Sequence, residues 1–597
     1  MAAKPCLCIP KVKHHCLRDA LCFHAGKALP QIRRLTTVTA FKEDLENEQE
    51  VRDRKERRVV KVAVIGGGMA GLGCLRALSG TAHVNATLFE STRVLGGRVR
   101  SMRRLGALSW DHGASHFSRP RDAGSPFYEV LRAAEKSGVV ELWHRRDKNA
   151  AKRAGIGTAE VYLDCQSGRW VIDHDSFQTD VGGNSEDAAS EHFVGVPDMA
   201  AVPSFIAREI VCAVQPEASW VGDNPEPGVP EYLTSCYVDR IRVLIGEETW
   251  VHAQSRRRWG MMLRIREGGD MWYKPFESDV VLLATNAPTA AAMLEAITVG
   301  ECREGISAEK NRSASATQMT CDIGSANEAR NEEEKKVNQA EVGIRARVSE
   351  LAVAARSVSG DTCWALTVAF DRPLGLRYDA ISLITNRHGR VRAGKANKSA
   401  EKSCPITFFA NNSSKPGRPS GGQGAAVAGW GYRWAEVGRA PEVGVGECWV
   451  VRASPEWSNK RAGLTNDDAA VELCAEFLSL IGYKESARST CSGREGNLDE
   501  VNVARVCYRK AFKWNHHLPL TRTGNFGGPT YRFHPEFGLG ACGDWISGVG
   551  ADVAYDGGVA LGEAVLAHLA KRGDFRQGAE GKGGSGEAIH GAEWSDM

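Results

Sequence analysis

The feature that most constrains the fold is an apolar run that leads directly into a cluster of glycines. Residues 59–65 read Val-Val-Lys-Val-Ala-Val-Ile, which is typical of a strand buried on both faces of a parallel sheet. Gly66-Gly67-Gly68-Met69-Ala70-Gly71 follows at once and satisfies G-x-G-x-x-G. Its first glycine allows a tight turn, its second lets a pyrophosphate approach backbone N–H groups, and its third lets helix and strand pack closely. A helix over residues 72–78 would then point its N-terminus at the phosphates.

A second apolar strand, over residues 86–89, ends at Glu90, nineteen residues after Gly71. A carboxylate at this place accepts hydrogen bonds from an adenosine ribose diol. A glycine match alone could be an accidental turn. Strand, glycines, helix, strand and acid occur here in the required order, so the sequence predicts a dinucleotide site.

Composition excludes several other classes of protein. The chain has 597 residues, of which 42% are hydrophobic and 25% charged, as in a soluble globular protein with a large core. Its formal net charge of only +3 predicts no nucleic-acid partner, because such a partner requires clustered basic charge. No apolar run reaches about 18 residues, so no integral membrane segment is expected. A small-molecule substrate is the expected partner.

The cysteines and the basic start of the chain bear on its compartment. Seventeen cysteines are scattered without the spacing of a zinc site or a disulfide framework, which favours a reducing compartment and no metal. Residues 1–40 hold seven Lys or Arg and one acid, Asp19, with no apolar stretch of a secretory signal. Two interpretations stay open: a transit peptide for a mitochondrion or plastid, or a disordered basic tail of a cytoplasmic protein. Secretion is not expected.

Two further segments favour FAD over a nicotinamide dinucleotide. The stretch from Arg93 to Arg98 contains Gly96-Gly97-Arg98, which resembles the FAD-contacting element of the flavin amine oxidase superfamily. Far along the chain, Gly543-Asp544 ends a short apolar stretch and precedes a helix of small residues. The resemblance implies that the glycines let the loop pass close to the flavin, that the arginines contact it or the phosphates, and that Asp544 holds the ribityl or phosphate region. The alternatives are surface arginines and a turn acid or helix cap.

The closer resemblance is to the renalase-like branch of these FAD proteins. It is carried by the order of several short motifs between about residues 60 and 570. These are Trp110–Phe117, His192–Met199, Asp279–Pro288, Thr362–Leu366, Asn412–Arg418 and Ala453–Ser458. The resemblance implies an α/β fold: a Rossmann-type FAD-binding domain of the p-hydroxybenzoate hydroxylase/amine oxidase type with an interleaved α+β substrate domain.

One segment departs from that branch. Gly550-Ala551-Asp552-Val553-Ala554 stands where the branch usually carries Arg-Val-Glu-Gly-Ala. Asp552 keeps a carboxylate on a shorter stem, and Val553 replaces a glycine. We expect Asp552 to cap the final helix and hold the flavin edge, with Val553 beside it; the alternative is an exposed loop acid.

The motifs and composition shifts divide the chain into seven parts. The predicted parts are 1–58 (basic leader and charged linker), 59–180 (first part of the FAD-binding domain), 181–299 (FAD-binding and β-meander segment), 300–347 (inserted disordered segment), 348–505 (substrate domain), 506–571 (closing part of the FAD-binding domain) and 572–597 (disordered tail).

The resemblance implies an oxidase that passes a hydride from a small reduced substrate of dihydronicotinamide type to FAD, with molecular oxygen as acceptor. No catalytic side chain is assigned, because the flavin carries the chemistry and the protein supplies position and electrostatics. His112 and His116 are expected to orient loops rather than transfer protons, and Trp545 is the best candidate to stack on a substrate. The alternatives are a flavin amine oxidase and a flavin-binding protein without turnover.

Overall fold

The computed structural model describes fourteen stretches of the chain. They are residues 59–104, 108–120, 122–143, 154–164, 167–179, 191–214, 230–244, 258–267, 269–299, 323–385, 403–418, 446–483, 504–515 and 529–572. The predicted leader at 1–58 therefore lies wholly outside the described residues, as does the chain from 573 onward. None of the helices within these stretches has the length and apolar character needed to cross a bilayer.

A six-stranded sheet carries the glycine motif. Its strands in spatial order are β10 (Glu231–Leu233), β2 (Val84–Phe89), β1 (Val60–Ile65), β14 (Val280–Leu283), β22 (Leu539–Cys542) and β21 (Tyr531–His534). All neighbours are parallel except β21, which runs antiparallel to β22. Val62 and Val64 of β1 face one hydrophobic core, whereas Ala63 and Ile65 face another. The prediction of a strand buried on both faces is thus confirmed.

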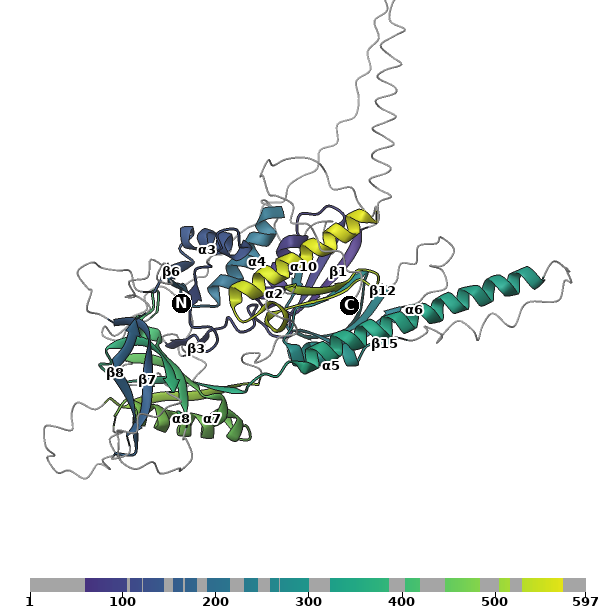
Figure 1. Cartoon of the computed structure of the whole chain (residues 1–597). Helices are drawn as coiled ribbons and strands as arrows, with labels where there is room; N and C mark the ends of the chain where they lie inside the picture. The colour runs from purple at the N-terminus through teal and green to yellow at the C-terminus, as the bar shows by residue number, and fades with distance from the viewer. Residues whose placement is uncertain are drawn as a thin grey trace, which may run out of the picture. The chain divides into compact units, whose positions relative to one another are not determined.

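Two helices from opposite ends of the chain pack against each other on one face of this sheet. They are α2 (Met69–Leu78) and α10 (Ala551–Lys571), which lie side by side in Figure 1. A Cβ on Gly558 would lie 2.0 Å from the carbonyl oxygen of Ala70, and one on Gly73 would lie 2.2 Å from that of Tyr555. The backbones therefore touch because both contact positions lack a side chain. Helices α3 (Pro126–Lys136) and α4 (Ala201–Val214) pack into the same core.

The opposite face of the sheet is covered by a four-stranded sheet and two helices. The strands are β13 (Asp270–Ser278), β12 (Arg258–Glu267), β11 (Cys236–Leu244) and β15 (Thr298–Val299), and the helices are α5 (Ala287–Glu295) and α6 (Ile323–Ser357). The long helix α6 is prominent in Figure 1. It differs from the prediction of a disordered insert at 300–347, since residues 323–347 are helical. Its buried side chains Ile344, Val348, Leu351 and Ala355 are three or four residues apart and form one apolar stripe.

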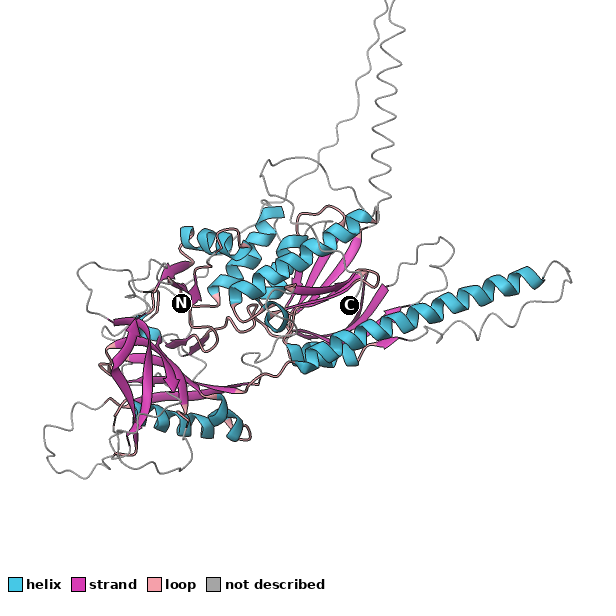
Figure 2. Cartoon of the chain, in the orientation of Figure 1, coloured by secondary structure: helices cyan, strands magenta, loops and turns pink. Residues whose placement is uncertain are grey.

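A seven-stranded sheet forms the second part of the fold. Its strands in spatial order are β20 (Val506–Trp514), β16 (Cys363–Phe370), β19 (Glu447–Ala453), β18 (Ile406–Asn411), β17 (Tyr378–Thr385), β7 (Ala154–Asp164) and β8 (Arg169–Thr179). Helices α7 (Pro455–Lys460) and α8 (Asn466–Leu480) cover one face of it, as Figure 2 shows. The buried tryptophans Trp364, Trp449 and Trp457 belong to this core, so they pack the sheet and offer no stacking surface to a substrate.

The sheet also differs from the predicted division of the chain. β7 and β8 lie within residues assigned to the first part of the FAD-binding domain, and β20 lies within its closing segment, yet all three pair into the seven-stranded sheet. The remaining short elements are β3 (Met102–Arg104) with β4 (Leu108–Trp110), β5 (Phe117–Ser118) with β9 (His192–Gly195) and β6 (Val140–Leu142), the 3₁₀ turn η3 (Asn412–Ser414) and α9 (Asp544–Ser547).

Candidate functional site

The candidate site lies at one edge of the six-stranded sheet. The neighbouring strands β2, β1, β14 and β22 are parallel, so their carboxyl ends meet at the same edge. The loops that follow them carry Glu90, the glycine motif, Asn286 and Asp544. Ligands of open α/β sheets bind outside the carboxyl ends of the strands. The sheet thus gathers residues that are hundreds of positions apart in the sequence.

The glycine loop leaves one open position between two tightly packed ones. Gly66 adopts φ +113°, and a Cβ on it would lie 2.5 Å from a backbone oxygen after β14. A Cβ on Gly71 would lie 1.9 Å from the Gly66 oxygen, whereas one on Gly68 would meet nothing within 4 Å. Gly68 also precedes α2 without giving its first turn a side-chain cap, so the N–H groups of Met69 and Ala70 have no acceptor in the helix. Free N–H groups at a helix N-terminus are of the kind that bind phosphate groups.

Glu90 is buried where β2 ends and is held by the loops around it. Its Oε2 accepts a 2.9 Å hydrogen bond from the backbone N–H of Gly67. Its Oε1 accepts from both the backbone N–H and the hydroxyl of Thr92, each at 2.7 Å. The Arg100 guanidinium donates to the same hydroxyl at 2.8 Å. A carboxylate has about four acceptor positions, so Oε2 can accept a further hydrogen bond, as a ribose hydroxyl requires.

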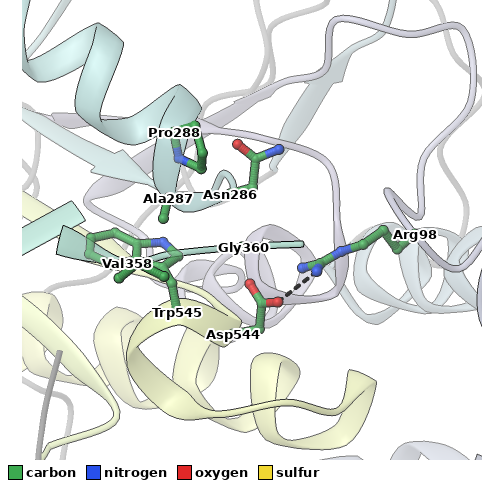
Figure 3. Close-up of a pocket in the computed structure, with 8 residues that line it drawn as sticks. All are labelled: Arg98, Asn286, Ala287, Pro288, Val358, Gly360, Asp544 and Trp545. Atoms are coloured by element: carbon green, nitrogen blue, oxygen red, sulfur yellow. Dashed lines mark ion pairs between the residues drawn. The ribbon is translucent and has the colours of Figure 1, made fainter. Parts of the chain in front are cut away.

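The Gly-Gly-Arg segment packs over the glycine loop and reaches the distal motif. The N–H of Gly96 donates to the Gly67 carbonyl at 2.7 Å, and a Cβ on Gly97 would lie 3.2 Å from the Gly68 Cα. Arg98 Nη1 then forms a 2.6 Å ion pair with Asp544 Oδ2, whose side chain is 8% exposed (Figure 3). Two of the predicted cofactor contacts, from opposite ends of the chain, thus meet at this edge.

A small hollow that is open to solvent adjoins this ion pair. Its walls come from the Gly-Gly-Arg segment, the start of α5, the stretch after α6 and the start of α9. They are Arg98, Asn286, Ala287, Pro288, Val358, Gly360, Asp544 and Trp545 (Figure 3). Trp545 is buried and donates its indole N–H to the Thr285 carbonyl at 3.1 Å, so it fixes the wall rather than offering an open face.

Three residues predicted to contact the cofactor, Arg93, Asp552 and Val553, take no part in the contacts described so far. Arg93 is exposed, and no contact among the described site residues involves it. Asp552 does not cap the final helix as predicted: the N-cap is Gly550, and no side chain makes a capping hydrogen bond there. The backbone at Gly550 has a φ of +145°, a conformation that favours glycine at this position. Asp552 and the half-buried Val553 lie in the first turn of α10, where the helix dipole still favours negative charge.

A buried charge cluster beside the site was not predicted. Asp111 is fully buried, and its Oδ2 accepts from Lys415 Nζ at 2.8 Å and from Arg418 Nη2 at 2.7 Å. Burial favours the neutral carboxyl, but the charges of Lys415 and then Arg418 outweigh it and hold the pKa of Asp111 well below its usual range. Burial lowers the pKa of Lys415 to about 8, although Asp111 opposes the shift. The sequence singled out Asp111 and Asn412–Arg418 only as motifs of a resemblance.

Two histidines flank this cluster in neutral form. Burial, and then the charge of Arg100, lower the pKa of His112 to about 4. His112 stacks on Trp514 with ring centroids 5.5 Å apart, and the Trp514 indole donates to the His112 carbonyl at 3.2 Å. Burial, and then the charge of His192, lower the pKa of His116 well below its usual value. Both arrangements support the interpretation of these histidines as framework. Among the described residues, no group of His, Cys, Asp and Glu is placed to hold a metal ion.

The His112 environment makes the stability of the fold depend on pH. Its pKa falls from 6.5 when unfolded to about 4 when folded, so the unfolded chain binds more protons between these values. Stability is therefore expected to decrease as the pH drops from 6.5 to 4, by about 3 kcal/mol from this residue. His112→Phe keeps the stacking and should remove that part. Urea unfolding at several pH values measures it; equal slopes for parent and variant would contradict the assignment.

The chain is similar in fold to several solved structures. Cyclohexylamine oxidase from Brevibacterium oxydans IH-35A is 11% identical over 86% of this chain and 100% of its own, with a TM-score of 0.40. An oxidoreductase from Methanosarcina mazei is 14% identical over 84% of this chain and 100% of its own, with a TM-score of 0.39. Reduced UDP-galactopyranose mutase is 10% identical over 85% of this chain and 94% of its own, with a TM-score of 0.44.

The segment that holds the glycine motif has a clearer match. Residues 64–133 match the family of NAD(P)-binding Rossmann-like domains. This span runs from β1 through α2, β2 and Glu90 into α3. The α/β class with a Rossmann-type nucleotide-binding unit is therefore confirmed by both the strand order and the sequence match.

Proposed function

We propose that the protein is an FAD-dependent oxidoreductase whose cofactor binds at the carboxyl edge of the six-stranded sheet. The observation that carries the proposal is the ion pair between Arg98 and Asp544 above the glycine loop. A nicotinamide site of Rossmann type needs the loop and Glu90 alone. Here a second loop and a distal helix are added at the same edge, which is what a longer flavin dinucleotide requires.

The described residues fit FAD along its length. The open position at Gly68 and the first turn of α2 would receive the pyrophosphate. Oε2 of Glu90 would accept from the ribose, and Arg98 with Asp544 would hold the ribityl or phosphate region. The start of α10 would direct its positive dipole toward the flavin edge. When bound, FAD supplies a two-electron acceptor for hydride, and the protein contributes position and electrostatics.

For the substrate, we propose a small reduced molecule of dihydronicotinamide type, with oxygen as final acceptor, as in the renalase-like branch. The charges beside the site support this over a flavin amine oxidase. Lys415 and Arg418 share one carboxylate, that of Asp111, and the charge of Arg452 acts on Lys415. A protonated amine would be repelled by this surplus of positive charge. A flavin-binding protein without turnover remains the alternative of a different class.

The first experiment asks whether the purified protein holds FAD without a covalent bond. Acid precipitation should release a yellow supernatant, and the native protein should lose its flavin absorbance when dihydronicotinamide isomers are added without oxygen. Amines serve as the comparison. Protein that takes up no FAD would refute the proposal as a whole, FAD that stays yellow with every donor would favour the protein without turnover, and bleaching by amines alone would favour an amine oxidase.

Gly68 provides a test of the cofactor's position that does not disturb the fold. Gly68→Ala places its methyl in open space at an ordinary φ of −77°, so the free energy of unfolding of the FAD-free protein should stay within about 0.5 kcal/mol of the parent. The methyl stands where a pyrophosphate would approach, so FAD affinity should fall about 10- to 100-fold. Fluorescence titration with FAD measures it.

Gly463→Ala is the matched control, since its Cβ also meets nothing within 4 Å but lies between α7 and α8. It should change neither stability nor FAD affinity. Equal FAD affinity for Gly68→Ala and the parent would move the pyrophosphate away from this loop.

A further inference from the structure

Four side chains form a row across the seven-stranded sheet, on the face opposite α7 and α8. Phe512 of β20 lies opposite Ala365 of β16, Ala365 opposite Arg452 of β19, and Arg452 opposite Phe408 of β18. Residues directly opposite in antiparallel strands point to the same face, so all four share it. The row places one guanidinium between two phenyl rings. Ala365, which lies between Arg452 and Phe512 in this row, is fully buried.

This row contacts Gly113, which packs on the loop that carries Arg98, one of the proposed FAD contacts. The Arg452 guanidinium donates a hydrogen bond to the Gly113 carbonyl. Gly113 in turn packs on the backbone of Arg98: a Cβ on it would lie 1.9 Å from the Arg98 oxygen, and the next N–H, of Ala114, donates to that oxygen at 2.9 Å. Only one stretch of backbone therefore separates Arg452 from the residue that pairs with Asp544.

Arg452 is surrounded by protein but lacks a counterion. Among the described residues no carboxylate acts on its charge, and its Nε is buried without a hydrogen-bond partner. Its contacts are the Gly113 carbonyl and the Phe408 ring, 4.9 Å from the guanidinium carbon. A buried cation is costly unless it is paired. The side chain nevertheless remains partly accessible, so an anion could reach it.

The surroundings do not neutralise this charge. The nearby cations Lys415 and Arg418 share the single carboxylate of Asp111, which leaves one positive charge over before Arg452 is counted. Lys415 and Arg452 are close enough for each to disfavour protonation of His116. The neighbouring His112 ring lies over Phe512, with centroids 4.8 Å apart, and adds apolar surface but no negative charge. The face thus combines surplus positive charge with aromatic walls.

We propose that Arg452 binds the anionic group, a carboxylate or a phosphate, of a substrate whose flat ring packs against the aromatic side chains of this row. The proposal rests on the proposed function, because it places the substrate between this sheet and the loop that holds FAD. It narrows the substrate class to acidic or phosphorylated ring compounds, for example a dihydronicotinamide that carries a phosphate. A guanidinium suits both oxyanions because its N–H groups form a planar fork.

Calorimetric titration of the whole protein with benzoate and with phenyl phosphate tests the proposal, with benzamide as the neutral comparison. At least one anion should bind, and Arg452→Gln should weaken it about 10- to 100-fold while benzamide binding stays the same. Arg452→Lys should retain part of the affinity. Whichever probe binds more tightly identifies the oxyanion as a carboxylate or a phosphate. Arg103→Gln, which removes an exposed guanidinium elsewhere, should behave as the parent.

Two outcomes would overturn the proposal. The first is equal anion affinity in the parent and Arg452→Gln, and the second is a parent that binds neither anion. If Arg452 only supported Gly113, its loss would lower the melting temperature and leave anion binding unchanged. The titrations are run on FAD-loaded and FAD-free protein. Failure of the parent to take up FAD would refute the proposed function, whereas a parent that binds neither anion, with or without FAD, would refute the role of Arg452.

Discussion

Asp111→Asn is expected to destabilise the fold by about 3–5 kcal/mol, the usual effect of removing one partner from a buried ion pair. The side chains of Lys415 and Arg418 are both 1% exposed, and their charges would be left without a carboxylate. The other oxygen, Oδ1, accepts hydrogen bonds from the Ser101 hydroxyl at 2.7 Å and from the Met199 N–H at 3.2 Å. The substitution would weaken both because it removes the negative charge of the acceptor. Urea unfolding at neutral pH measures the loss.

Two comparisons make the Asp111 result specific. Glu472→Gln removes an ion pair with Arg461 in which both side chains are substantially exposed, and it should cost at most about 1 kcal/mol. Lys415→Met in the Asp111→Asn background removes one of the stranded cations and should restore part of the loss. If Asp111→Asn alone were as stable as the parent, the cluster would contribute nothing to the free energy of unfolding.

Gly558→Ala is expected to cost more than about 3 kcal/mol, beyond the common range for overpacked cores. The added Cβ would lie 2.0 Å from the Ala70 carbonyl oxygen and 3.0 Å from the Cys74 nitrogen. Both obstacles are backbone atoms of α2, so no side chain can rotate away and the helices must separate. Because α2 and α10 also begin at the proposed cofactor edge, FAD retention should fall together with the melting temperature.

Gly343→Ala is the matched control for Gly558. It is also a glycine inside a helix, but its Cβ would meet only the Phe537 ring, at an ordinary 3.4 Å. Because alanine favours helix more than glycine, this variant should be as stable as the parent or up to about 1 kcal/mol more stable. If both substitutions had the same small effect, the close contact between α2 and α10 would be wrong.

The nucleotide-binding edge could be predicted because its signals are local. Strand, glycines and helix follow one another within twenty residues, and Gly71 packs on the nearby Gly66 carbonyl, although Gly66 itself packs on the distant backbone after β14. The Gly-Gly-Arg segment and Gly543-Asp544 were found in the same way, from short motifs. The helix α6 was missed because its apolar stripe, Ile344 to Ala355, crosses the boundary set at 347, and the charged residues before it dominate the composition.

The sequence by itself determined that a Rossmann-type unit begins near residue 59 and which residues form its glycine loop, because the strand, the glycines and the helix follow one another directly in the chain. Only the tertiary structure decided what lies opposite that loop. The ion pair of Arg98 with Asp544, the Asp111 cluster and the hydrogen bond from Arg452 to Gly113 all join segments that are distant in the chain. Whether a charge is buried, and whether it is neutralised, depends on strand pairing between such segments, and no local pattern encodes that.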